Sequence, residues 1–523
     1  MEHYDVVILG TGLSECVLSA VLSQSGYSVL QLDSSDRYGT SFQNYNYVDL
    51  CTRYNKPGHS ALVPLSSKFS IDYTPKLLLA GGLTQRVLIK YDLSTLVNFL
   101  LVPGCYVYKH RLYEVPTSET KSLQTGLISF LQKPRLVRFF YNVRKYFRNV
   151  PIKLLGTMRE QYKHYGVDEH SAQVIGHAIA LNLDDNYLDE RPSVTFEKIR
   201  LYIESLRENG DEISPFVYPL YGMSEVCQAF VRKASVAGAV YRLRTSVEEI
   251  RSCGEFSICM GESDGEDTRG RTNQDNEGVS AGATNDVKTA TTGDSTKSGH
   301  NDQKMRGDQN IKADGANKGG ETSSHDGEQE DKSRLNPQGG GNEGGKGAHY
   351  NFTVKIRPEN ENTLEVRCKA LISDISYTPN KRPTNTKIIR ATLIVDGVVP
   401  LLKHVPSAQI LFLSSGLHRK TDVFALILGH RECVAPKGYK VVLISYVKEG
   451  DDDKTLDKII HLFGKVVDRF VREEEVMVNE SVGRGWYVVS DCDESMHVEN
   501  GMHEVVKVLE RMKKDGFKIE CSF

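Results

Sequence analysis

Short apolar runs and helical spacings alternate over the first 35 residues. An apolar run rich in β-branched side chains, Tyr4–Leu9, predicts a buried parallel strand. Small and apolar residues at helical spacing predict a helix over Cys16–Gln24, which Gly26 ends. A second apolar run, Tyr27–Leu32, predicts another strand with Asp33 at its end. Strand, helix and strand in this order predict a Rossmann-type unit.

Helical spacing dominates residues 117–206. Ser118, Asp168 and Ser193 are residue types that commonly begin helices, and each stands near the start of such a segment. We therefore expect a smaller all-helical subdomain inserted into an α/β body. The predicted helices are Leu123–Leu131, Arg135–Phe147, Thr157–Tyr165, Ser171–Leu181 and Thr195–Leu206.

Strand patterns flank the helical stretch. Period-two alternation at Cys105–Lys109 and Arg111–Val115 predicts a hairpin. After residue 207, Val217–Tyr221 predicts a strand, Ser224–Val236 a helix and residues 239–258 further strands. We expect the strands of residues 350–374 to resume the sheet that is interrupted near residue 260. The later predicted elements are strands at Tyr350–Ile356, Leu364–Arg367, Ala370–Asp374 and Val441–Tyr446, and helices at Thr455–Arg472 and Met502–Lys513.

A low-complexity segment interrupts this sheet. Residues 261–348 contain no Phe, Tyr, Trp or Cys, a single Pro, and 18 of the 44 glycines. Such a composition lacks the apolar surface that offsets the entropy of folding, so we expect a disordered insertion. The loop-closure cost grows only logarithmically with length, which makes a long insertion between paired strands tolerable.

The pattern divides the chain into five segments. We expect a Rossmann-like body beginning at residues 1–116, the helical subdomain at 117–206, and a return to the body at 207–260. The disordered insertion at 261–348 precedes the rest of the body at 349–523. The predicted fold class is α/β.

Composition excludes several classes of protein. The net charge is −3, and outside the insertion it is +3, which leaves no strong field for nucleic acid. The ten cysteines form no C-x-x-C pair, so a disulfide scaffold or a zinc ribbon is not expected. No apolar run reaches the length of a membrane span, and the N-terminus lacks the basic region of a signal peptide. We expect a cytoplasmic protein without a metal site.

A glycine-rich turn follows the first predicted strand. Gly10 and Gly12, with Asp33 after the second strand, match a dinucleotide-binding fingerprint, but the third position is Glu15. A carboxylate there would repel a phosphate about 5 Å away by roughly 3 kcal/mol at an effective dielectric of about 20. The helix dipole would return only about 0.3–1 kcal/mol. We interpret the motif as a vestige rather than a live cofactor site and expect no flavin.

The other candidate ligand or binding residues can each be explained by a purely structural role. His177 lies in an apolar helical stretch. A histidine in such a position is more often a hydrogen-bonded core residue than a ligand of a metal or cofactor. Asp184 and Asp185 could be a metal pair, but a turn or helix cap is favoured because no further carboxylates cluster with them. A basic run interleaved with aromatic residues, 135–148, suits RNA or anionic lipid. An amphipathic helix with snorkelling cations explains the same run.

Several blocks of sequence together resemble one family. The segment from Tyr4 to Ser19, with Glu15 and Cys16 after the second glycine, resembles the opening of Rab GDP dissociation inhibitors and Rab escort proteins. The resemblance is strong over residues 1–260 and weaker over 350–515. The other matching blocks are 32–39, 69–76, 107–108 with 115–118, 176–181, 185–189 and 219–222.

The resemblance implies a fold like that of FAD-dependent monooxygenases, without FAD, and no enzyme activity. Family members bind GDP-loaded, geranylgeranylated Rab GTPases, slow nucleotide release and extract Rabs from membranes. We therefore expect prenylated Rab and its geranylgeranyl lipid as partners, transient contact with membranes, and a monomer. The family's Rab-binding platform corresponds to Tyr38, Glu225, Gln228, Arg232, Tyr241 and Arg242.

The spacing of these residues is consistent with a platform. Glu225, Gln228 and Arg232 are three and four residues apart, so they share one helix face, although a solvated face would have the same pattern. Val240 and Arg242 depart from the residues usual in the family, which leaves partner specificity or a weakened platform open.

The resemblance also assigns a lipid site and a branch of the family. It places the prenyl chain in the helical subdomain, where a simple core explains the same pattern, and residues 207–214 correspond to a mobile loop with two extra residues. The length without the insertion and the block 185–189 favour a dissociation inhibitor over an escort protein, which remains the alternative. An FAD-dependent oxidoreductase is the remote alternative.

Overall fold

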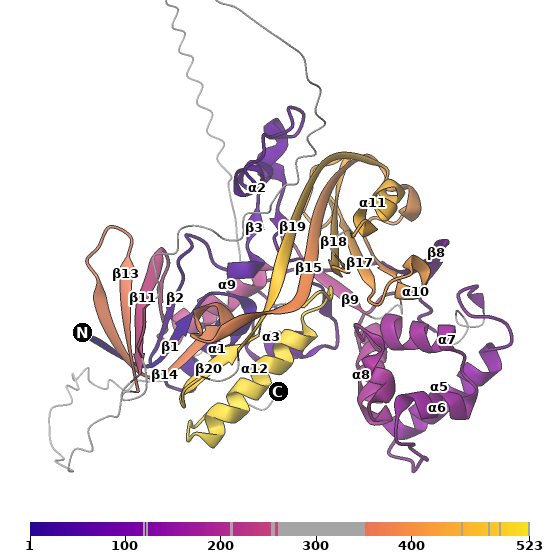
Figure 1. The fold of residues 1–523 in the computed structure, drawn as a ribbon, viewed down its shortest axis with the longest axis horizontal. Coiled ribbons are helices and arrows are strands. Elements are labelled where there is room, and N and C mark those ends of the chain that lie inside the picture. Colours follow the sequence, from indigo (N-terminus) through magenta and orange to yellow (C-terminus); the bar gives the residue numbers. More distant parts are fainter. Residues whose placement is uncertain are drawn as a thin grey trace, which may run out of the picture. The chain divides into compact units, whose positions relative to one another are not determined.

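Two large β-sheets and a group of helices form the described part of the chain (Figure 1). The computed structural model describes residues 1–118, 121, 124–209, 213–252, 257–259, 351–450, 453–479, 482–490 and 493–520. The predicted disordered insertion, 261–348, lies outside the described residues.

The predicted βαβ unit forms the centre of the first sheet. Strand β1 (Glu2–Leu9) pairs in parallel with β2 (Val29–Leu32), and helix α1 (Leu13–Gln24) connects them. On its other side β1 pairs in parallel with β14 (Leu364–Asp374), so the segment after the insertion completes this sheet. The remaining strands are β10 (Val240–Arg242), β11 (Thr245–Ser252), β12 (Ser257–Cys259), β13 (Phe352–Pro358) and β20 (Trp486–Val489).

The strand order is β10-β2-β1-β14-β13-β11-β12, with β20 also paired to β14. β11 and β13 lie on either side of the insertion in sequence and pair antiparallel, with Ile250 opposite Val354. The prediction that the sheet resumes after the insertion is therefore confirmed. The predicted break between residues 367 and 370 is wrong, because β14 runs through it without interruption.

The second half of β1, Val6–Leu9, is buried on both faces, as a parallel strand with layers on either side requires. Val6 and Ile8 pack with α1, α9 (Ser224–Val236) and α12 (Glu499–Lys514) in one core cluster. Val7 and Leu9 belong to a second cluster. The predicted bounds of α9 are confirmed, and α12 extends the predicted helix by three residues at its start and one at its end.

The second sheet is antiparallel except for one pair. Its order is β19-β15-β18-β17-β16-β7-β8, and only β16 and β7 run parallel. The predicted hairpin is confirmed as β7 and β8, which turn at His110, where φ is 59°. The strands are β7 (Gly104–Lys109), β8 (Arg111–Glu114), β15 (Lys381–Asp396), β16 (Ala408–Phe412), β17 (Val423–Leu428), β18 (Tyr439–Val447) and β19 (Lys465–Asn479).

The helix predicted over Thr455–Arg472 is wrong in its second half. Helix α11 (Thr455–Ile460) ends in the short 3-10 turn η7 (His461–Phe463), and Gly464 follows with a φ of 91°. From Lys465 the chain is the edge strand β19, which pairs along β15 (Figure 1). Backbone pairing over this length prevails over the helical spacing of a few apolar residues.

Helices α5 to α8 lie together and close on an aromatic core (Figure 1). The Thr157 side chain caps α6, and Asp168 caps α7 as predicted. The helix predicted over 123–131 is wrong for residues 125–131, which form turns, and α8 begins at Pro192 rather than after Ser193. The helical elements are α5 (Lys133–Phe147), α6 (Met158–Tyr165), α7 (Glu169–Gln173), the π-helix η3 (Val174–Ile179), η4 (Asp185–Asp189) and α8 (Pro192–Glu208).

Short elements complete the described chain, and none of its helices combines the length and apolarity that crossing a membrane requires. The short strands are β3 (Asn44–Tyr45), β4 (Ile71–Asp72), β5 (Leu78–Leu79), β6 (Phe99–Leu101) and β9 (Phe216–Pro219). The short helices are η1 (Thr40–Phe42), α2 (Tyr47–Arg53), η2 (Val63–Lys68), α3 (Leu83–Lys90), η5 (Ile375–Tyr377), η6 (Pro400–Leu402) and α10 (Ser414–Leu417).

Candidate functional site

A carboxylate fills the space beside the glycine turn that follows β1. Gly10 has a φ of 100°, which glycine adopts without strain. The Glu15 side chain, on the first turn of α1, is buried next to this turn. A Cβ atom on Gly12 would lie 2.6 Å from Glu15 Oε2. In a dinucleotide-binding turn, the pyrophosphate approaches the backbone at this glycine.

Three donors from the chain itself form hydrogen bonds to the Asp33 carboxylate. Thr11 Oγ1 donates a hydrogen bond to Asp33 Oδ2 at 2.5 Å, and Thr40 Oγ1 donates to the same oxygen at 2.9 Å. The Ser35 N–H donates to Asp33 Oδ1 at 2.8 Å. The carboxylate that would bind a ribose hydroxyl in a dinucleotide site therefore already has three internal donors. Together with Glu15, these contacts do not fit a bound flavin or nicotinamide dinucleotide.

The same turn supports Tyr38. The Gly39 N–H donates to Thr11 Oγ1 at 3.0 Å, and Gly39 has a φ of 115°. The Tyr38 ring lies edge-on to Tyr241, with a centroid distance of 5.9 Å and an interplanar angle of 84°. The Tyr241 hydroxyl and Ser19 Oγ are hydrogen bonded at 2.9 Å. The glycine turn, α1 and β10 thus jointly position this tyrosine pair.

Three polar side chains share the outer face of α9. Gln228 and Arg232 are exposed, and Glu225 is half-buried. Burial raises the pKa of the Glu225 carboxyl. The opposite face of α9 packs against α1, with Val226 and Phe230 fully buried. The common face predicted from the spacing is confirmed.

A buried aspartate fixes the start of α9. Asp72 Oδ1 accepts a hydrogen bond from the Met223 N–H at 2.9 Å, and Oδ2 accepts one from the Tyr218 hydroxyl at 2.6 Å. Burial raises the pKa of Asp72 to about 7. Gly222 precedes the helix with a φ of 109°, and a Cβ there would collide with Asp72 and with Asn44. The position therefore requires glycine.

Arg242 does not join the tyrosine pair. Its Nη2 donates to both carboxylate oxygens of Glu2, at 2.7 and 2.9 Å, and this contact lowers the pKa of Glu2. Successive strand residues point to opposite faces, so Arg242 and Tyr241 on β10 are directed apart. Val240, the other departure from the family pattern, is 39% exposed.

Tyr221 is a residue of this surface that the sequence analysis includes only within a matching block. Its side chain is 53% exposed and its φ is 68°. Its carbonyl accepts a hydrogen bond from Ser70 Oγ at 2.6 Å, and its N–H donates to the Glu432 carbonyl at 3.1 Å. An exposed ring held in a strained backbone conformation directly before α9 marks a candidate contact. Neither periodicity nor spacing signals it in the sequence.

Comparison with known families decides the family of the chain. A family model described as GDP dissociation inhibitor matches residues 1–272 and 350–522. The chain belongs to the GDP dissociation inhibitor family. The unmatched stretch, residues 273–349, covers most of the predicted insertion, so the family's sequence pattern continues on both sides of it.

Two curated relatives of this GDP dissociation inhibitor family member match over nearly its full length. It is 29% identical to a guanosine nucleotide diphosphate dissociation inhibitor of Arabidopsis thaliana, covering 97% of this chain and 94% of the relative. It is 24% identical to Rab GDP dissociation inhibitor beta of Rattus norvegicus, covering 99% of this chain and 97% of the relative.

Solved structures show the same fold. The crystal structure of a Rab GDI from Plasmodium falciparum matches with a TM-score of 0.72 at 23% identity, with all of both chains covered. An oxidoreductase from Methanosarcina mazei matches with a TM-score of 0.51 at 13% identity, covering 97% of this chain and 100% of that one. The GDP dissociation inhibitor fold is therefore the mixed α/β, FAD-oxidoreductase-like fold that the sequence analysis expects.

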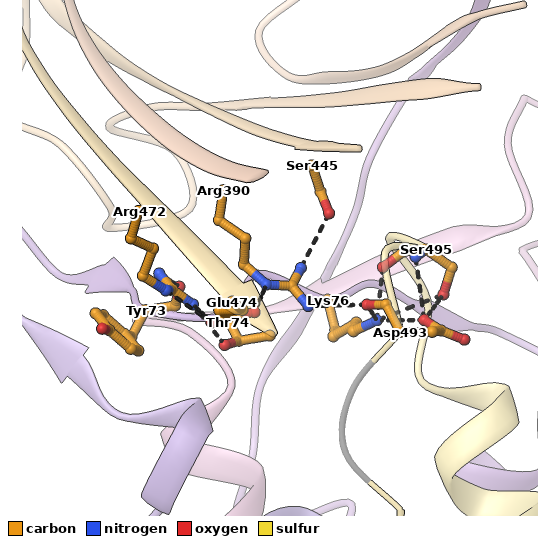
Figure 2. A network of polar contacts seen from close by, with 9 residues as sticks. All are labelled: Tyr73, Thr74, Lys76, Arg390, Ser445, Arg472, Glu474, Asp493 and Ser495. Atoms are coloured by element: carbon orange, nitrogen blue, oxygen red, sulfur yellow. Dashed lines mark hydrogen bonds and ion pairs between the residues drawn. The ribbon is translucent and has the colours of Figure 1, made fainter. Parts of the chain in front are cut away.

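A network of charged side chains connects the second sheet to two loop segments, residues 73–76 and 493–495 (Figure 2). Glu474 on β19 accepts from Arg390 Nε at 2.5 Å and from Arg472 Nε at 2.7 Å. The Arg472 guanidinium lies 3.5 Å from the centre of the Tyr73 ring. Burial would raise the pKa of Glu474, but the two arginines outweigh it and lower the pKa to about 2.

A buried lysine continues this network. Lys76 Nζ donates to Asp493 Oδ1 at 2.8 Å and to the Ser495 carbonyl at 2.6 Å, and Arg390 Nη2 donates to the Asp493 carbonyl at 2.9 Å (Figure 2). Burial opposes ionisation of Asp493, yet the Lys76 ammonium holds the pKa of that carboxyl well below its usual range. The network fixes the segment around Lys76 against the second sheet. Its members come from widely separated parts of the chain, so no local sequence pattern signals it.

His177 lies between two carboxylates. Its Nδ1 is 2.5 Å from Asp422 Oδ2, and its Nε2 is 3.2 Å from Asp185 Oδ1. Burial lowers the pKa of His177, but hydrogen bonds to Asp185 and Asp422 outweigh it and raise the pKa to about 9. The interpretation of His177 as a hydrogen-bonded core histidine is confirmed. Asp184 accepts from the Asn186 N–H at 2.9 Å and caps η4, as the structural alternative for that residue predicts.

The helical region encloses an aromatic core. Phe139 is fully buried, and its ring lies 5.3 to 5.9 Å from the rings of Phe140, Tyr162, Tyr165 and Phe196. Its helices therefore pack on one another in this structure, and a bound prenyl chain would require some of them to separate. Within the described parts of the chain, no group of three His, Cys, Asp or Glu side chains is arranged to hold a metal ion.

Proposed function

We propose that this protein binds geranylgeranylated Rab GTPases in their GDP-bound form, slows GDP release, and carries them between membranes and the cytosol. Membership of the GDP dissociation inhibitor family supports the proposal. The names of the rat and Plasmodium proteins specify Rab as the partner of those relatives. We extend that partner to this chain.

The observation that carries the proposal is the outer face of α9. Glu225, Gln228 and Arg232 offer an acceptor, an amide and a fixed cation on one rigid helix, whose start is held by Asp72. The ring of Tyr38 is held beside Tyr241 by the glycine turn. A preformed helix needs no ordering of its backbone on binding, which favours a specific protein contact. We assign the docking of the GTPase to this face, together with Tyr221.

The prenyl chain needs a separate apolar site. Moving a chain of about twenty carbons out of a membrane loses up to ~16 kcal/mol of transfer free energy, at ~0.8 kcal/mol per CH₂. We assign this site to the helical region, where separation of α5 from its neighbours would expose aromatic and aliphatic side chains such as Phe139 and Leu136. Protein and lipid contacts on one ligand then combine through effective concentration.

We propose that the protein is a non-enzymatic regulator. Glu15 beside Gly12, and the internal donors to Asp33, oppose a bound flavin at the former cofactor turn. We further propose that the protein is a cytoplasmic monomer that contacts membranes transiently. The turn then has a new role, because Thr11 binds the Gly39 N–H and so helps to hold Tyr38.

Extraction of prenylated Rab from liposomes tests the proposed function. The full chain should release GDP-loaded Rab into solution and leave GTP-loaded Rab on the membrane. The double variant Tyr38→Ala/Arg232→Ala should lose extraction while keeping its melting temperature within a few degrees. Lys233→Ala, which removes the neighbouring cation on α9, is the matched control and should extract normally.

Two outcomes would contradict the proposal. One is equal extraction in both nucleotide states, and the other is full extraction by the double variant. Capture of unprenylated Rab together with a prenyltransferase would instead support the escort-protein alternative.

A further inference from the structure

One stretch of the helical region carries no acidic residue. Residues 120–159 contain nine Lys and Arg and no Asp or Glu. The chain as a whole has a net charge of −3, so this stretch departs from the average composition. A run of cations without carboxylates generates a local positive potential.

Helix α5 presents these cations on its outer face. Its inner face buries Leu136, Phe139 and Val143 in the helical core. Positions 137, 141, 144 and 148 follow one another at spacings of four, three and four, so Val137, Tyr141, Arg144 and Arg148 lie along one exposed side. The core contacts of α5 therefore lie on the opposite side, and these four positions are exposed to solvent.

Large apolar side chains are exposed on the same helix and just before it. Phe130 is 83% exposed and Leu131 is 77% exposed, in the turn that leads into α5. On α5 itself, Val137 and Tyr141 are each 57% exposed. Lys145 Nζ lies 4.6 Å from the centre of the Tyr141 ring, so cation and aromatic ring stand side by side. Exposed apolar side chains gathered at one place mark an interaction surface.

Cations combined with exposed aliphatic and aromatic side chains match the chemistry of an anionic bilayer. Lys and Arg are attracted to acidic headgroups, while Phe, Leu and Tyr gain free energy in the interfacial region. The aliphatic side chains of Leu131 and Val137 distinguish this target from RNA, because they offer no stacking surface to a base. The cations and the apolar residues together therefore favour lipid.

We propose that the outer side of α5 and the preceding turn form a docking surface for an anionic phospholipid leaflet. The residues of this surface are Phe130, Leu131, Val137, Arg138, Tyr141, Arg144, Lys145 and Arg148. The surface extends the proposed function, because an extractor must reach the membrane. Its test uses no GTPase, so that lipid docking and Rab extraction can fail independently.

Several carboxylates on the elements that follow α5 pair with groups other than its cations. Glu160 accepts from the Gly156 and Thr157 N–H groups at the start of α6, and Asp189 on η4 pairs with Arg159 on α6 at 3.0 Å. Glu204 on α8 pairs with Arg200 at 2.8 Å. Each of these three carboxylates thus pairs with a group outside α5.

Flotation with vesicles measures the docking directly. The full chain, without any GTPase, is mixed with vesicles of phosphatidylcholine alone or of phosphatidylcholine and phosphatidylserine at about three to one. We expect binding that depends on phosphatidylserine and weakens as salt is raised. Because each cation near an acidic leaflet contributes about fivefold, Arg138→Gln/Arg144→Gln/Arg148→Gln should reduce partitioning by about a hundredfold.

Two further variants separate charge from apolar contact. Lys437→Gln/Lys458→Gln/Lys514→Gln removes the same charge from exposed positions elsewhere and should change partitioning less than about twofold. Phe130→Ser/Leu131→Ser keeps every cation and should reduce partitioning by about tenfold or more, since both side chains leave the interface.

The proposal is overturned if the full chain ignores phosphatidylserine, or if the α5 and control triple variants lose binding equally. It is also overturned if short RNA binds more tightly than the vesicles and displaces them. Every substituted side chain is exposed, so the melting temperatures of all three variants should stay unchanged, and any loss of binding then belongs to the surface.

Discussion

The imidazole Nδ1 of His177 lies 2.5 Å from Oδ2 of Asp422 and ties the helical region to the second sheet. His177 belongs to the π-helix η3, and Asp422 also accepts the Ser414 N–H at 2.7 Å, at the start of α10. Because Asp185 approaches the other ring nitrogen, the protonated imidazole bridges two carboxylates. The contact therefore depends on the charge of the histidine.

Stability should fall in alkaline solution as this contact is lost. The folded pKa of His177 is raised to about 9, above the unfolded value, so its contribution is complete below about pH 6.5 and disappears as pH rises through 9. The loss should be on the order of 3 kcal/mol in the free energy of unfolding. Urea unfolding of the wild type and of His177→Gln between about pH 6 and 10 measures it. Parallel pH profiles of the two proteins would contradict the assignment.

Glu474 should be much more important for stability than its neighbour Glu475. Glu474→Gln leaves the buried guanidinium groups of Arg390 and Arg472 without their shared carboxylate and should cost about 3–5 kcal/mol. Glu475→Gln removes only an exposed contact to Lys387 at 3.4 Å and should cost less than about 1 kcal/mol. Chemical unfolding compares the two variants, and similar losses would refute the role of the network.

The space at the glycine turn can be tested by adding one methyl group. Gly12→Ala should destabilise the protein by about 1–3 kcal/mol, because the new Cβ meets the Glu15 carboxylate. The double variant Gly12→Ala/Glu15→Ala should recover most of that loss. Gly501→Ala, in α12, finds only an ordinary contact 3.7 Å from Ser14 Oγ and should be neutral or slightly stabilising. No recovery in the double variant would show that Glu15 does not fill the turn.

Residues 261–348 should be dispensable for folding and for binding of Rab. Their composition cannot build a core, and the family pattern continues on both sides of them. Replacement by a short Gly/Ser linker should leave the melting temperature and the affinity for prenylated Rab nearly unchanged. Calorimetry and a binding titration of the shortened chain provide the measurement, and a collapse of either would assign a structural role to the segment.

Local pattern predicts much of this fold where tertiary contacts agree with it. The bounds of α9 follow from its own periodicity, and the βαβ unit from its apolar runs. The edge strand β19 escapes prediction because its inward positions Asp468 and Arg472 carry charges and hide the alternation. Asp468 is buried beside Tyr47, whose hydroxyl donates to it at 2.6 Å from more than 400 residues away. Such partners are invisible to any local window.

In the candidate site, too, the sequence predicts what depends on one element and misses what depends on contacts between distant elements. Spacing alone predicts that Glu225, Gln228 and Arg232 share a face, since one helix carries all three. It cannot show that Arg242 turns away to Glu2, because that pairing joins β10 to the start of the chain. Nor can it show that Asp72 anchors α9. These contacts depend on which strands become neighbours, and the docking roles themselves remain predictions.

The rate of GDP release from prenylated Rab tests the central claim most directly. A fluorescent GDP analogue bound to prenylated Rab should dissociate much more slowly when the full chain is present in excess. Gln228→Ala/Arg232→Ala should abolish the slowing at the same protein concentration, since loss of a desolvated charge contact costs about 2–5 kcal/mol. Lys233→Ala should retain it. An unchanged release rate with the wild type, or full slowing by the double variant, would contradict the account.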